Sequence, residues 1–152
     1  METITDSLRE LKTVLSEQGI RAALIFLNGL TEHRFTALYR FDRETLKNLY
    51  FVDRDNPAQE SVPDIPVMAS YCVFVRNSRS RFSTPDSLQD DRVGDHPKRR
   101  EVQSYCGVPL RDTNGEMFGT ICHFDFRPIP ISDANVELME AVAPLLKPSM
   151  PK

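Results

Sequence analysis

The first hydrophobic pattern along the chain has a helical period. Four apolar residues recur at this spacing in an otherwise charged segment: Leu8, Leu11, Val14 and Leu15. Thr5 or Asp6 can cap the predicted helix, and Gly19 marks its end. Residues 20–30 predict a second, shorter and more buried helix, which ends at Asn28-Gly29.

The pattern then changes to that of strands. Residues 35–41 and 46–52 are rich in aromatic and β-branched residues, and residues 42–45 form a polar turn between them. This arrangement predicts an antiparallel hairpin. Asp53 and the residues after it end the second strand.

A second hairpin has the clearest local signal in the chain. Residues 102–110 and 117–126 predict two strands, and Asn114-Gly115 lies between them. Asn-Gly suits the positive φ angles of a two-residue hairpin turn. Gly119, inside the second strand, predicts close backbone packing or a bulge.

The region between the hairpins mixes loops with short elements. Residues 58–66 contain prolines that indicate a loop, and Pro66 suits the first turn of a helix that runs through Val75. Residues 79–84 predict a short strand. Residues 86–100 are highly charged, which is typical of a disordered loop or a functional lid.

The chain ends with another amphipathic pattern. Ser132 or Asp133 can cap a last helix, and Pro144 is predicted to end or kink it. Its apolar side carries Val136, Leu138, Met139, Val142 and Leu146. Hairpins with helices at both ends predict an α+β fold: an antiparallel sheet, the terminal helices on one face, and the middle helix with the charged loop on the other.

Composition agrees with one globular domain. The 152 residues are 40% hydrophobic and 27% charged, enough to form a core without disulfides. We expect one domain over residues 1–152, with a helical segment at 1–30, a core at 31–147 and a frayed tail at 148–152. The net charge of -3 does not favour nucleic acid, and no apolar run reaches the length of a membrane span. We predict a cytoplasmic protein without nucleic-acid or membrane partners.

Motifs in the second hairpin resemble those of GAF domains. Residues 104–122 read SYCGVPLRDTNGEMFGTIC, which is similar to the family's "Y-x-G-x-P-L" strand, "D-x-x-G" turn and "x-G-T-L" strand in unbroken order. Tyr71-Cys72, followed by a short strand and Asp86, is similar to the family's "C…D" segment. The resemblance extends over about residues 20–146.

The resemblance implies a fold and a function. It implies a profilin-like antiparallel sheet of about six strands, with a ligand pocket roofed by the helix near Tyr71 and by loop 86–100. The terminal helices would pack on the opposite face, which is the family's usual dimer surface. We therefore expect a stand-alone sensory module that binds a small polar or anionic ligand, with no cofactor, and signals through a homodimer or a separate partner protein.

The charged loop supplies candidate ligand contacts. Residues 76–101 hold seven basic and five acidic side chains, a net charge of +2. Arg92, His96 or Arg99 could fold over an anion, because a guanidinium presents two donors in one plane; the alternative is an ordinary solvated surface. Asp86 and Asp125 could bind a ligand amine or cap turns.

Other candidates are aromatic or lie on strands. Four rings bracket the expected pocket, as ligand contacts or as core: Tyr71, Phe74, Phe82 and Tyr105. His123 alternates with Cys122 and Phe124, so one of these sets faces the pocket and the other faces the helices. His123 is either structural or part of a sensing site.

The three cysteines leave an enzymatic alternative open. Their wide spacing, without C-x-x-C, predicts reduced thiols and no metal site. GAF proteins that reduce free methionine sulfoxide carry cysteines in a "G-V-C-G" segment and a "G-H-I-A-C-D" loop; Cys72 matches the first, but residues 94–98 contain no sulfur. We predict binding rather than catalysis. The alternatives are thiol-dependent sulfoxide reduction and a ligandless dimerisation scaffold.

Overall fold

A six-stranded antiparallel sheet forms the centre of the computed structural model, which describes residues 3–146. The strand order is β3-β2-β1-β6-β5-β4. The strands are β1 (Phe35–Asp42), β2 (Thr45–Asp53), β3 (Ile65–Pro66), β4 (Phe82–Thr84), β5 (Ser104–Arg111) and β6 (Met117–Asp125). The helices are α1 (Ile4–Gln18), α2 (Ile20–Asn28), α3 (Cys72–Ser78) and α4 (Asp133–Leu146), with 3-10 turns at Val67–Ala69 and Ser87–Gln89.

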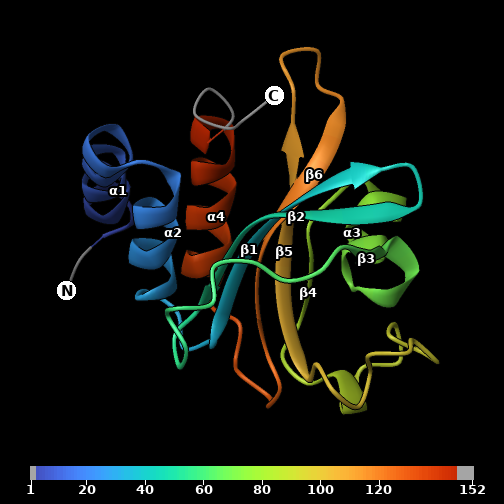
Figure 1. The fold of residues 1–152 in the computed structure, drawn as a ribbon. Helices are drawn as coiled ribbons and strands as arrows, with labels where there is room; N and C mark the ends of the chain where they lie inside the picture. Colours follow the sequence, from blue (N-terminus) through green and yellow to red (C-terminus); the bar gives the residue numbers. More distant parts are fainter. Residues whose placement is uncertain (1–2, 147–152) are drawn as a thin grey trace.

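The helices divide between the two sides of the sheet (Figure 1). Helices α1, α2 and α4 lie together on one side, and α3 lies on the other side with the loop that precedes β5. The predicted α+β layout is therefore confirmed. No helix within residues 3–146 is long and apolar enough to cross a membrane.

Helix α1 begins earlier than its pattern predicted. Its N-cap is Thr3, not Thr5 or Asp6. The Asp6 amide donates to Thr3 Oγ1 over 3.1 Å, and the Asp6 carboxylate accepts from the Thr3 amide in return. This capping box satisfies two amides that the helix leaves open. Gly19, with φ of 93°, ends α1 as predicted and starts α2.

Both predicted hairpins form, but the turn of the second differs. Only Gly115 takes a positive φ, 80°, whereas Asn114 does not. The Asp112 carboxylate accepts from the amides of Asn114 and Glu116, and the Asp112 amide bonds the Glu116 carbonyl at 2.8 Å. The loop therefore has three residues, 113–115, with glycine in the left-handed position of a bulge. The prediction of a two-residue turn was wrong.

The segment after Pro66 also departs from its prediction. Ile65 and Pro66 pair with β2, and Ser70 is extended, so a 3-10 turn and α3 replace the single helix expected through Val75. Arg79 takes a left-handed conformation with φ of 56° after α3. The predicted strand at 79–84 is therefore shortened to Phe82–Thr84.

Helix α4 is capped as predicted by Ser132, whose Oγ accepts from the Asn135 amide at 3.1 Å. Pro144 does not end the helix, which continues to Leu146. A proline near the C-terminal end removes only one hydrogen bond to the preceding turn, and packing against β5 offsets this loss. The predicted tail at 148–152 lies outside the described residues.

Alternate strand residues form two separate cores. The helical face, which α1, α2 and α4 cover, is mainly aliphatic and includes Leu38, Val108 and Ile121. The opposite face, which we call the pocket face, includes Tyr39 and Cys122 and is rich in aromatic residues. Gly119 keeps the central strands close, since a Cβ there would lie 2.0 Å from the Tyr39 carbonyl oxygen. The predicted close backbone approach is confirmed.

Candidate functional site

A pocket of about 260 Å³ lies against the pocket face of the sheet. Its floor consists of alternate residues from the three central strands: Phe35, Tyr39, Tyr105, Cys122 and Phe124. Its walls and rim are Phe51, Val62, Pro63, Ile65, Ala69, Ser70, Tyr71, Lys98, Glu101, Val102 and Phe126. The lining is mostly apolar and aromatic, which is the usual character of small-molecule sites.

Aromatic rings contact one another along the floor. The rings of Phe35 and Phe124, on β1 and β6, stack with centroids 4.8 Å apart. Phe51 and Phe126 approach Phe35 at 5.6 and 5.0 Å. Phe126 is 45% exposed. The pocket therefore has a rigid aromatic base with one exposed ring beside it.

Tyr71, immediately before α3, joins the roof to the following loop. Its hydroxyl donates to the Val102 carbonyl at 2.8 Å, and its ring meets Tyr105 edge-on at 5.6 Å. His96 closes the same junction. Its Nδ1 accepts from the Lys98 amide at 3.0 Å, so Nε2 carries the proton and donates to the Ser70 carbonyl at 3.1 Å. Burial lowers the pKa of His96, in keeping with a neutral ring.

The Tyr39 hydroxyl is the notable polar group of the floor. Tyr39 is 6% exposed, and its hydroxyl makes no hydrogen bond to residues 3–146. Within this range, the fully buried side-chain atoms that lack a partner are His33 Nε2 and Thr84 Oγ1, so the Tyr39 hydroxyl is open to the pocket that the residue lines. Burial raises its pKa well above the ordinary value, so the hydroxyl remains protonated. A hydroxyl that is open to a pocket can bond water or a polar atom of a ligand.

A thiol lies under the roof. Cys72 Sγ is 3.2 Å from both the Tyr105 hydroxyl and Thr120 Oγ1. Burial disfavours its ionisation, but hydrogen bonds from Cys122, Ser70 and the two hydroxyls outweigh that effect and lower its pKa to about 7. Burial raises the pKa of Cys122 well above normal.

Gly107 makes this arrangement sterically feasible. A Cβ at Gly107 would lie 2.2 Å from the Tyr105 hydroxyl oxygen, so the tyrosine ring occupies the space that a side chain would take. The third thiol, Cys106, lies on the helical face, 3.7 Å from Met139 Sδ, and burial raises its pKa to about 12.

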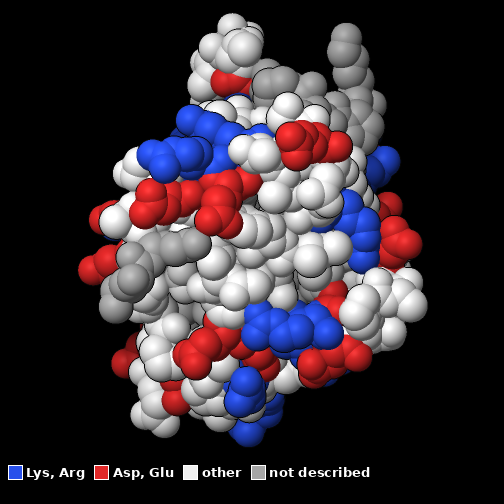
Figure 2. Space-filling view, turned by 90° about the vertical axis from the view of Figure 1, so that its left-hand side faces the viewer, with Lys and Arg blue, Asp and Glu red and all other residues white. Residues whose placement is uncertain are grey.

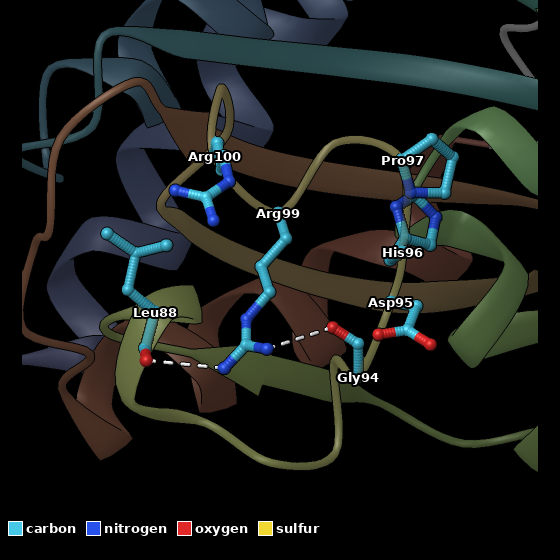
Figure 3. Close-up of a pocket in the computed structure, with 7 residues that line it drawn as sticks. All are labelled: Leu88, Gly94, Asp95, His96, Pro97, Arg99 and Arg100. Atoms are coloured by element: carbon cyan, nitrogen blue, oxygen red, sulfur yellow. Dashed lines mark hydrogen bonds between the residues drawn. The ribbon is translucent and has the colours of Figure 1, made fainter.

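Arg99 is bound by its own loop rather than facing the pocket. Its guanidinium donates to the carbonyls of Ser87, Gly94 and Leu88 at 3.0 to 3.2 Å. Figure 3 shows two of these bonds in a separate hollow of about 510 Å³, which His96 also lines. Arg99 therefore holds together the loop that sequence analysis described as disordered or a lid.

Arg92 is also engaged within the loop. It donates to the Asp90 carboxylate and the Ser83 carbonyl, and lies over the ring of Phe82 with its Cζ 4.8 Å from the centroid. The Arg92 guanidinium lowers the pKa of Asp90 to about 2. Neither Arg92 nor Arg99 lines the 260 Å³ pocket.

The two candidate aspartates accept backbone hydrogen bonds. Asp86 Oδ1 accepts from the Leu88 amide at 3.1 Å. The Asp125 carboxylate accepts from the amides of Arg34 and Arg127, at 2.9 and 3.1 Å. The contacts with Leu88 and Arg127 are local turn-capping contacts, whereas the bond to the Arg34 amide links β6 to the segment before β1.

His123 faces away from the pocket. It lies on the helical face, where Nδ1 is 2.7 Å from Thr36 Oγ1 and its ring stacks on His33 with centroids 6.0 Å apart. Burial lowers the pKa of His123 to about 3 and that of His33 to about 4. Cys122 and Phe124 are thus the set that faces the pocket.

Of the ten ligand-binding candidates, Tyr71 and Tyr105 line the pocket. Phe74, Phe82 and His96 form an adjoining aromatic cluster, with Phe74 4.7 Å from Phe82 and 5.5 Å from His96. Sequence reasoning missed Phe35, Tyr39, Phe51, Phe124 and Phe126. The alternation within the predicted strands was the signal that could have located the strand residues.

The described residues contain no cluster of three or more His, Cys, Asp or Glu side chains that could hold a metal ion. The aromatic rings, the Tyr39 hydroxyl and the Cys72 thiol are the groups that the site offers to a ligand or substrate.

Comparison with known proteins agrees with this geometry. The GAF domain family model matches residues 4–147, while no relative was found among curated proteins. The GAF domain of an Acinetobacter phosphoenolpyruvate-protein phosphotransferase has a TM-score of 0.77 at 12% identity, over 98% of this chain and 94% of that one.

Two other similar structures are an enzyme in complex with its substrate and a GAF domain with a bound ligand. Free methionine-R-sulfoxide reductase from Neisseria meningitidis, in complex with its substrate, has a TM-score of 0.75 at 14% identity, over 96% of this chain and 87% of that one. The phycoerythrobilin-bound GAF domain of a cyanobacterial phytochrome has a TM-score of 0.73 at 13% identity, over 98% and 95%. At such identities these likenesses show a common fold, and with the family match they establish that the chain belongs to the GAF domain family, whose members are typically ligand-binding sensory or regulatory modules.

Proposed function

We propose that this chain is a regulatory module that binds a small molecule in the pocket between the sheet and α3. The observation that carries the proposal is the 260 Å³ pocket itself, with its aromatic floor and a Tyr39 hydroxyl that is open to the pocket and makes no hydrogen bond to residues 3–146. A ligand would gain contacts with the rings and would bond the hydroxyl.

The contrast with the other side of the sheet supports a ligand rather than simple packing. On the helical face, three helices fill the space above the strands with aliphatic side chains. On the pocket face, short segments leave part of the aromatic surface without protein contacts. An apolar, aromatic lining of this kind is typical of sites that bind small molecules.

The contacts between Tyr71 and the loop before β5 couple ligand binding to the conformation of that loop. Tyr71 and Val102 both line the pocket and are hydrogen-bonded to each other at 2.8 Å. A ligand that contacts both would stabilise this closed arrangement relative to an open one, which is the differential affinity that a population shift requires. The responding segment is residues 86–102, which includes the predicted lid.

The terminal helices are the proposed output surface, through a homodimer or a partner protein. Figure 2 views the molecule from the side of α1 and α2. On that face, acidic and basic side chains lie above and below a central area without charged residues. The two signs of charge are mixed, so the face has no large patch of one sign. Ile25 on α2 is 49% exposed. An uncharged area bordered by charges suits a modest protein interface.

Native mass spectrometry of freshly purified protein tests the proposal, because one spectrum reports oligomeric state and retained small molecules. We expect a bound mass that is lost in Ala69→Trp, a variant that fills the pocket from its wall. Hydrogen exchange in residues 86–102 should be slower in the liganded protein. An empty pocket, with the same exchange in wild type and in the filled variant, would favour the ligandless dimerisation scaffold instead.

Thiol-dependent reduction of free methionine sulfoxide is a second candidate, supported by the Cys72 thiol, which lies 3.2 Å from the hydroxyls of Tyr105 and Thr120, and by the lowering of its pKa. In that reaction a dithiol is oxidised to a disulfide, and the sulfoxide oxygen leaves as water. We would measure turnover with methionine sulfoxide and dithiothreitol, using Cys72→Ser and the control Cys106→Ser. Turnover that Cys72→Ser abolishes would support this function, and absence of turnover would remove it.

A further inference from the structure

We propose that the ligand is a neutral, planar aromatic molecule of one or two rings, with one polar atom that hydrogen-bonds the Tyr39 hydroxyl. This inference rests on the proposed function and specifies its ligand class. It departs from the polar or anionic ligand that the charged loop suggested.

Charge in and around the pocket argues against an ionised ligand. Among the described lining residues, the charged side chains are Lys98 and Glu101, which pair with each other at 2.9 Å. Beside the pocket, the Arg34 guanidinium lies over the rings of Phe35 and Phe126 and pairs with Asp53 at 2.8 Å. The Arg99 guanidinium is occupied by carbonyls of its own loop, and Arg92 by Asp90 and Ser83. An ion in the pocket would lose hydration without gaining a free counter-charge, which is strongly unfavourable.

The floor favours a flat ring. Phe35 and Phe124 stack side by side on adjacent strands, and Phe51 and Phe126 extend the aromatic surface. Aromatic rings gain from offset or edge contacts beyond the area that they bury. The volume of about 260 Å³ equals that of roughly nine water molecules at about 30 Å³ each, which limits the ligand to one or two rings.

Tyr39 fixes where the ligand's polar atom must lie. Its side chain comes from the middle of β1, and its hydroxyl stays protonated because burial raises its pKa. It can therefore donate to a ring nitrogen or a carbonyl oxygen, or accept from a hydroxyl or an N–H. A purely hydrocarbon ligand would fill the pocket but would exclude water from this hydroxyl and leave it without a partner.

Three two-ring probes of similar shape test the inference: quinoline, naphthalene and 2-naphthoate. Calorimetric titration near pH 7.5 should rank quinoline about fivefold tighter than naphthalene, from one hydrogen bond, and 2-naphthoate weakest by at least tenfold. Tyr39→Phe should abolish the advantage of quinoline and leave naphthalene affinity unchanged. Tyr50→Phe on β2, a tyrosine that packs against the helical-face core, is the matched control and should behave as wild type.

The negative results distinguish an error in the ligand class from an error in the role of Tyr39 or in the proposed function. If 2-naphthoate binds most tightly, and Ala69→Trp blocks it, the ligand class is wrong while the proposed pocket function stands. If quinoline keeps its advantage in Tyr39→Phe, the assignment of Tyr39 is overturned. If no probe binds and native mass spectrometry finds no retained molecule, the proposed function fails together with the inference. Urea unfolding of each variant verifies that it is folded.

Discussion

The two faces of the central sheet are made from the same strands, yet they differ in composition and in what covers them. On the helical face, Leu38, Val108 and Ile121 are almost fully buried under α1, α2 and α4. On the pocket face, Tyr39 and Tyr105 stand beside a space that short segments only partly close. One side of the sheet therefore supplies packing stability, while the other leaves an aromatic surface partly uncovered, where we propose that a ligand binds.

The largest expected effect comes from truncating a packed side chain on the helical face. Leu38→Ala should lower the free energy of unfolding by about 3 kcal/mol, because the side chain is completely buried and leaves a cavity. Urea denaturation measures the loss. Val108→Ala on the helical face and Val102→Ala on the pocket wall form a matched pair, and we expect the first to be more destabilising. Equal losses in the pair would contradict the division of roles.

Gly119 allows strands β1 and β6 to approach closely, so its substitution should disturb both faces of the sheet. In Gly119→Ala the new methyl group would meet the Tyr39 carbonyl, 2.0 Å from its ideal position. Backbone must shift, and we expect a loss of about 2 kcal/mol in urea unfolding. Gly29→Ala is the control, because its nearest contact is 3.3 Å and its φ is helical. A neutral Gly119→Ala would show that the two strands can separate freely.

Acid should weaken the helical face through its buried histidines. Folded His123 has a pKa of about 3 and His33 of about 4, whereas unfolded histidine titrates near 6.5. As pH falls below about 6.5 the unfolded chain binds protons that the folded chain does not, so stability is lost down to about pH 4.

The size of this acid effect can be isolated with one variant. Between pH 6.5 and 5.5, wild type should lose about 1 kcal/mol more than His123→Gln, by urea unfolding at each pH. His96→Gln, on the pocket side, serves for comparison, because its half-buried ring should contribute less. Parallel pH profiles for wild type and His123→Gln would contradict the assignment of this effect to His123.

The smallest effects concern the loop. Arg99→Met removes three hydrogen bonds to loop carbonyls and should speed amide exchange across residues 87–99, with about 1 kcal/mol lost overall. Arg100→Met, at an exposed position of the same loop, should change stability by less than about 0.5 kcal/mol. Equal exchange in both variants would show that Arg99 does not organise the loop.

The sequence was a good guide to the sheet and a weaker guide to the site. Alternation located both long hairpins, and Gly119 indicated the close strand approach, because these features depend on local pattern and sterics. The pocket depends on which face the distant segments cover. Alternation groups Phe35 with Tyr39 on one face of their strand, but only the fold shows that this face lines the pocket. Arg99 was predicted to contact a ligand, and its partners in the structure are carbonyls of its own loop.

Methyl NMR during a titration with quinoline is the most direct test of ligand binding at the pocket face, because valine and isoleucine methyl groups report on each face of the sheet separately. We expect chemical-shift changes at Val62 and Val102, which line the pocket, and none at Val108 and Ile121 on the helical face. Changes confined to Val108 and Ile121, or none at Val62 and Val102 at saturating quinoline, would contradict this expectation.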